Sequence, residues 1–149
     1  MHQFKLPWLF ALWVAATLLL SGCSAQAGPT ISAPEAQQAS AEQRLTLIDV
    51  RTPAEWRQTG VAPSALLIDM NQPGGKQGFV QRVLQAVQGD KTTPIALICR
   101  TGNRSGATQQ ALLEAGFTQV VNVSEGMAGS RAGPGWLRRG LPVEACTNC

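Results

Sequence analysis

Cys99-Arg100-Thr101-Gly102-Asn103-Arg104-Ser105 is the stretch that decides the fold. The apolar residues 94–98 before it are typical of a buried strand, and residues 106–115 after it favour a helix. A loop between a strand and a helix N-terminus turns successive backbone N–H groups toward one point, which makes an anion-binding concavity. Arg100 and Arg104 add positive charge. These features favour the Cys99 thiolate over the thiol, so the sequence predicts a nucleophile that attacks an anionic substrate.

The composition indicates one globular domain. The chain has 149 residues, of which 44% are hydrophobic and 14% charged, and this length is sufficient for a proper core. The net charge of +3 is small and the basic residues are dispersed, so we expect no nucleic-acid partner. Tyrosine is absent, and the single histidine is His2.

The N-terminal segment has the pattern of an export signal. Residues 6–20 are almost wholly apolar, which is short for a membrane span and suits a signal peptide. Leu20-Ser21-Gly22-Cys23 follows and resembles the lipobox of bacterial lipoproteins, in which cleavage precedes the cysteine and lipid joins its sulfur. This resemblance implies a signal peptide over 1–22 and lipidation of Cys23. The alternative is an uncleaved anchor in which Cys23 is incidental.

The lipobox has two further implications. An exported domain that begins at Cys23 contains no histidine, which excludes Cys–His hydrolase chemistry and His-ligated zinc, and we expect neither a metal nor a cofactor. Ser24 is not the aspartate that commonly retains lipoproteins at the inner membrane, so the periplasmic face of the outer membrane is favoured. Residues 23–30 read as the lipidated cysteine and a short linker.

Helices and strands alternate through the rest of the chain. Ser32-Ala33-Pro34-Glu35 and Thr52-Pro53-Ala54-Glu55 are capping boxes, each of which predicts a helix start. Strands are predicted over residues 45–50, 65–68, 94–98 and 119–123, and helical segments over 79–87 and 136–139. This alternation predicts an α/β domain with a mainly parallel sheet, and Cys99 lies at the carboxyl end of a strand, where such sheets bind ligands.

Several motifs together resemble the rhodanese (sulfurtransferase) domain family. They are Leu47-Ile48-Asp49-Val50-Arg51 with Glu55-Trp56, the Cys99 loop, Gly116-Phe117, and Trp136 with Gly140-Leu141-Pro142-Val143. The resemblance covers residues 31–143 and is greatest to small exported single-domain rhodaneses. It implies one domain with a central, mainly parallel sheet and helices on both faces, in which Cys99 accepts a sulfane sulfur as a persulfide.

The chain departs from that family in three segments. Residues 60–65 replace a His-Ile-x-Gly-Ala segment that many members carry. Residues 126–135 are longer and richer in glycine than usual, and are a candidate border of the site. The tail 144–149, with Cys146 and Cys149, is extra.

The predicted reaction is sulfur transfer through Cys99. Its thiolate attacks the outer sulfur of a thiosulfate-like donor, and a thiol or cyanide then accepts that sulfur. We expect the backbone N–H groups of the loop to stabilise the persulfide. The side chain of Arg104 is expected to face the anion, and Arg100 to lean outward and steer the donor. The predicted substrate-binding residues are Arg100, Thr101, Gly102, Asn103, Arg104 and Ser105.

Two other functions remain open at this point. A Cys-loop phosphatase also surrounds an anion with a cysteine and an arginine, but usually places five residues between them, whereas four separate Cys99 and Arg104. Cys146 and Cys149 form either a local disulfide or a thiol redox and sulfur-relay pair; a lone CxxC without histidine does not indicate zinc. Asp49 and Arg51 are expected to form a structural pair at a strand end.

Overall fold

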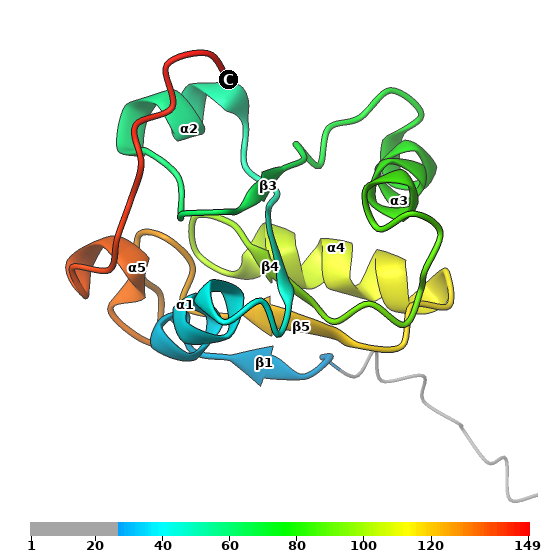
Figure 1. Ribbon diagram of the computed structural model, residues 1–149, viewed down its shortest axis with the longest axis horizontal. Coiled ribbons are helices and arrows are strands. Elements are labelled where there is room, and N and C mark those ends of the chain that lie inside the picture. The colour runs from blue at the N-terminus through cyan, green and yellow to red at the C-terminus, as the bar shows by residue number, and fades with distance from the viewer. Residues whose placement is uncertain (1–26) are drawn as a thin grey trace, which may run out of the picture.

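The computed structural model describes residues 27–149, and the predicted signal peptide 1–22 and Cys23 lie outside them. The strands form one parallel five-stranded sheet in the order β1-β5-β4-β2-β3 (Figure 1). The strands are β1 (Thr30–Ile31), β2 (Thr46–Asp49), β3 (Leu66–Leu67), β4 (Ile95–Ile98) and β5 (Val120–Val123). The helices are α1 (Ala33–Ala41), α2 (Pro53–Thr59), α3 (Gly75–Ala86), α4 (Asn103–Glu114) and α5 (Gly135–Arg138).

Helices cover both faces of the sheet. Side chains alternate along the central strands, so Ile48 and Leu97 join one apolar cluster with residues of α3 and α4. Leu47 and Ile98 point to the other face and join a second cluster with residues of α1 and α5. All four residues of β4 are buried, as expected of a strand covered on both sides. The predicted α/β fold is therefore confirmed.

Both predicted capping boxes are present. Ser32 accepts a hydrogen bond from the Glu35 backbone N–H, and the Glu35 carboxylate accepts one from the Ser32 N–H. Thr52 and Glu55 repeat this arrangement at the start of α2, and each helix has proline in its first turn. These reciprocal bonds satisfy N–H groups that the helix itself cannot.

Helix α4 begins three residues earlier than predicted, so Asn103, Arg104 and Ser105 lie in its first turn. Gly102 precedes it with φ of +90°, and a Cβ there would lie 2.1 Å from the Ser124 carbonyl oxygen. Only glycine fits this close approach. The helix start was missed because no Ser, Thr or Asp side chain caps it.

The domain also extends beyond its predicted ends. Thr30 was predicted as linker but pairs, with Ile31, against β5, and the Pro29 carbonyl accepts a hydrogen bond from the Gln109 side chain. At the other end Glu144 forms an antiparallel bridge with Val61. The tail thus lies against the α2 region (Figure 1).

The end of the tail is held by two further contacts. A disulfide joins Cys146 to Cys149, and the Arg57 guanidinium donates a hydrogen bond to the Cys149 carbonyl. No helix within residues 27–149 is long and apolar enough to cross a bilayer.

Candidate active site

Cys99 directly follows β4, at the carboxyl end of the sheet. It is fully buried and packs in the cluster on the α3 and α4 face. The Gly102 N–H donates a hydrogen bond to its Sγ at 3.1 Å, and the Ser105 hydroxyl lies 3.2 Å from the same atom. Two donors from the start of α4 therefore meet at the sulfur.

The segment after β5 holds the loop from outside. The Met127 N–H donates to the Cys99 carbonyl at 2.9 Å, and the Ala128 N–H donates to the Arg100 carbonyl at 2.8 Å. The Asn122 side chain donates to the Gly102 carbonyl at 3.0 Å. With these carbonyls occupied on the outer side, the loop backbone is fixed with its N–H groups turned inward.

Most of those N–H groups are unengaged. Five backbone N–H groups in the loop and the first turn of α4 have no hydrogen-bond acceptor within residues 27–149, whereas the Gly102 N–H donates to Sγ. The five are Arg100, Thr101, Asn103, Arg104 and Ser105. Free donors at the start of a twelve-residue helix provide the partial positive charge that an anion needs. The roles predicted for these residues stay predictions.

Arg104 is paired with a carboxylate, which the sequence did not predict. Its two terminal nitrogens donate to the Glu55 carboxylate at 2.8 and 2.5 Å, which is a bidentate ion pair between α4 and α2. The hydrogen bonds from Arg104 lower the pKa of Glu55 to about 2. Partial burial raises this pKa, and the hydrogen bonds from Thr52 lower it further by smaller amounts. Glu55 in turn raises the pKa of Arg104. Both groups are therefore charged at any working pH.

Three loop residues, Thr101, Gly102 and Asn103, border a cleft of about 520 Å³. Arg100 and Asn103 are exposed, and Thr101 is half-buried. Thr101 and Asn103 line the cleft opposite residues 129–132, which include Arg131. The glycine-rich segment thus lies beside the loop, as its sequence suggested.

Asp49 and Arg51 form the structural pair expected from the sequence. The two side chains are buried and joined at 2.6 Å. Arg51 also donates to the Thr59 hydroxyl and the Gly60 carbonyl, so the pair ties the end of β2 to the C-terminal end of α2. It holds α2 in place above the sheet edge.

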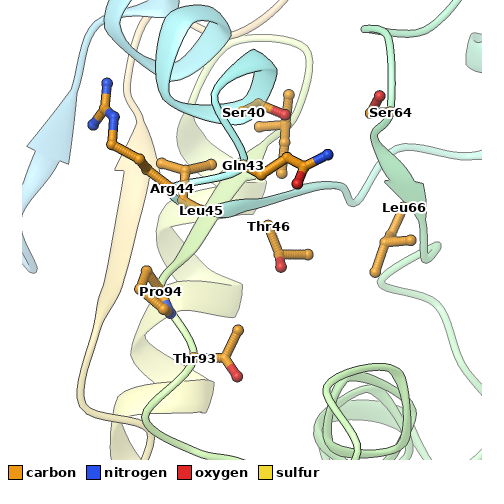
Figure 2. Close-up of a pocket in the computed structure, with 10 residues that line it drawn as sticks. Ser40, Gln43, Arg44, Leu45, Thr46, Ser64, Leu66, Thr93 and Pro94 are labelled. Atoms are coloured by element: carbon orange, nitrogen blue, oxygen red, sulfur yellow. The ribbon is translucent and has the colours of Figure 1, made fainter.

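Another cleft lies at the wrong end of the sheet for this chemistry. Figure 2 shows Thr46, Leu66 and Pro94 around a volume of about 340 Å³. Thr46 begins β2 and Pro94 precedes β4, so this cleft opens at the amino ends of the strands, opposite Cys99. Among the residues described, no three His, Cys, Asp or Glu side chains are grouped as metal ligands would be.

The family model of the rhodanese-like domain matches residues 32–132 of this sequence. The chain belongs to that family. A sulfurtransferase from Allochromatium vinosum is 28% identical over 109 residues, which cover 73% of this chain and 87% of the relative. The polysulfide-sulfur transferase homodimer of Wolinella succinogenes has 28% identity and a TM-score of 0.58, with 80% of each chain covered. A human single-domain sulfurtransferase has 25% identity and a TM-score of 0.51, with 66% of this chain and 91% of its own covered.

The sequence reasoning missed how this rhodanese-like domain uses Glu55. Glu55 was assigned to a capping box, which it does form, but its pairing with Arg104 was not predicted. No signal within the sequence marks this pair: Glu55 follows β2 and Arg104 follows β4, and only the strand order of the sheet makes these strands neighbours. Residues that follow neighbouring parallel strands meet at the same edge.

Proposed function

We propose that the protein is a sulfurtransferase that carries a sulfane sulfur on Cys99, taken from a thiosulfate-like donor. The observation that supports this best is the surrounding of Sγ by the Gly102 N–H and the Ser105 hydroxyl, beside unengaged loop N–H groups. These donors suit a thiolate before transfer and a terminal persulfide sulfur after it. The name of the Allochromatium relative agrees with this chemistry.

The reaction has two displacement steps. In the first, the Cys99 thiolate attacks the outer sulfur of thiosulfate, a sulfur–sulfur bond forms to Sγ, and sulfite leaves with the electron pair of the broken bond. In the second, an acceptor thiolate or cyanide attacks the terminal sulfur, and Cys99 leaves as the thiolate. Neither step needs a general acid, because both leaving groups depart as stable anions.

Burial of Cys99 limits how the donor approaches. Cys99 is 0% exposed, so the groups around Sγ must move outward slightly before a donor sulfur can contact it. The exposed Arg100 is placed to attract the anion before this movement. A polysulfide, which the Wolinella relative's name mentions, presents the same kind of terminal sulfur and is a second donor of this class.

The decisive experiment is mass spectrometry of the protein after treatment with thiosulfate, together with thiocyanate release in the presence of cyanide. We expect one added sulfur atom on Cys99 and steady thiocyanate production, both of which Cys99→Ser abolishes. The double variant Cys146→Ser/Cys149→Ser is the matched control and should keep both. Loss of transfer in that control would favour a relay through the tail, and equal activity of Cys99→Ser would refute the proposal.

We also propose that the domain works outside the cytoplasm, anchored by lipid on Cys23 at the periplasmic face of the outer membrane. The lipobox-like Leu20-Ser21-Gly22-Cys23 supports this proposal. Six residues separate Cys23 from β1, and a chain of that length reaches about 13 Å on average. The catalytic domain is then held close to the bilayer.

A further inference from the structure

The Arg104–Glu55 pair changes how the site handles charge. Arg104 lies in the first turn of α4, yet both terminal nitrogens of its guanidinium donate to the Glu55 carboxylate, at 2.8 and 2.5 Å. A guanidinium bound in this way has its charge neutralised and its terminal nitrogens occupied. A donor anion therefore does not meet a free Arg104.

Glu55 is fixed in turn by its own helix. Its Oε2 also accepts hydrogen bonds from the Thr52 N–H and hydroxyl, both at 3.1 Å. The side chains of Arg104 and Glu55 are only 33% and 22% exposed. The carboxylate is thus held in one position by four donors, and it stays there as a negative charge beside the Cys99 loop.

We propose that Glu55 is a specificity-determining residue that sets the net charge of the site, and that Arg104 acts by neutralising Glu55 rather than by binding the donor. The donor's negative charge is then held by the free loop N–H groups and by the exposed Arg100. With the pair neutral, the site gains less from a doubly charged donor than it would with Arg104 unpaired. This inference rests on the proposed sulfur transfer at Cys99.

The proposal gives opposite signs for the two single variants. Glu55→Gln leaves an uncompensated guanidinium, so KM for thiosulfate should fall by about tenfold. Arg104→Gln leaves an uncompensated carboxylate, so KM should rise by about tenfold. The double variant restores neutrality and should return KM to within about threefold of the wild-type value. Both single effects should shrink as salt is added.

The charge of the donor provides a second readout. An arenethiosulfonate is a sulfane donor with one negative charge, whereas thiosulfate has two. The change in log KM should therefore be about half as large for the arenethiosulfonate as for thiosulfate. A merely structural role for the pair would change KM for both donors equally, or would change kcat alone.

Helix α1 supplies a matched control. Ser32 and Glu35 form the same capping box as Thr52 and Glu55, but Glu35 bonds no arginine of the part of the chain that the structure describes. Glu35→Gln removes a capping carboxylate of the same kind and should leave KM unchanged. Thermal unfolding of each variant checks that it is folded before its kinetics are measured.

The outcomes separate this inference from the proposed function. A double variant as poor as Arg104→Gln would show that Arg104 binds the donor directly, and would overturn the inference. A Glu55→Gln protein that is folded, forms the persulfide and has unchanged KM would also overturn it, with the sulfur transfer intact. A wild-type protein that forms no persulfide with any donor would instead refute the proposed sulfur transfer itself.

Discussion

The hydroxyl of Ser105 provides the sharpest test of the geometry around the sulfur. Ser105 is fully buried, and its Oγ lies 3.2 Å from Sγ and 3.2 Å from the Gly102 carbonyl oxygen. Ser105→Ala removes this donor without adding bulk. The Gly102 N–H then remains as the donor to Sγ among the described residues.

The magnitude follows from the strength of a hydrogen bond to a charged group. Such a bond contributes about 1.5–3 kcal/mol, and we take the lower end because the hydroxyl is shared with a carbonyl. Negative charge returns to Sγ when the acceptor takes the terminal sulfur, because Cys99 then leaves as the thiolate. Loss of about 1.5 kcal/mol of stabilisation at that step slows transfer from the persulfide to cyanide by up to roughly tenfold.

The assay separates the two half-reactions. The persulfide is formed with thiosulfate and verified by mass spectrometry, and its single-turnover transfer to cyanide is then followed as thiocyanate release. Ser105→Ala should be slower than wild type in this second half-reaction by up to roughly tenfold.

A matched control lies one turn further along α4. Thr108 is buried, and its hydroxyl donates to the Arg104 and Ser105 carbonyls without contacting the sulfur. Thr108→Val removes a hydroxyl from the same helix and should leave the rate of transfer to cyanide unchanged. If Ser105→Ala transfers its sulfur as fast as wild type, or if Thr108→Val is slowed equally, the Ser105 hydroxyl does not stabilise charge on Sγ and the reasoning is refuted.

Two further predictions concern Glu55 and Cys23. The pKa of Glu55 is lowered from 4.5 to about 2, so its ion pair stabilises the fold above pH 4.5 and loses this contribution as the pH falls toward 2. The pair is partly exposed, so solvent screening reduces its contribution to about 1–2 kcal/mol. In urea titrations, the free energy of unfolding of wild type should exceed that of Glu55→Gln at pH 7, and this excess should fall by about 1–2 kcal/mol between pH 7 and pH 2. A difference that stays constant with pH would contradict the prediction. Cys23→Ala should leave an unprocessed precursor that takes up no labelled fatty acid in cells, and continued labelling would show that the lipid is attached elsewhere.

The parts of the structure that local chemistry decides were predictable from the sequence. The two capping boxes specify where α1 and α2 begin, because each signal lies within four residues. The buried strand before Cys99 and the helix after it were visible in the same way. The position of Cys99 at the carboxyl edge of the sheet followed from that order alone.

The parts that depend on strand order were not predictable. Strand β1 has two residues, too few to show a period, and exists because β5 offers it an edge. The Glu55–Arg104 pair forms because β2 and β4 are neighbours, a fact of topology and not of spacing. The early start of α4 depends on the contact of Gly102 with the Ser124 carbonyl, which is also a long-range feature.

The pairing of Arg104 also bears on the choice between sulfur and phosphoryl transfer. A phosphoryl group in its transition state spreads negative charge over three oxygens, and enzymes meet that charge with fixed cations. In this site both terminal nitrogens of Arg104 are bound to Glu55, so the exposed Arg100 is the loop cation left to meet an anion. A persulfide needs less, since its charge is on the single terminal sulfur bonded to Sγ, and the Gly102 N–H and the Ser105 hydroxyl already point to Sγ. The site therefore suits one transferred sulfur better than a phosphoryl group, which would meet one exposed arginine of the loop.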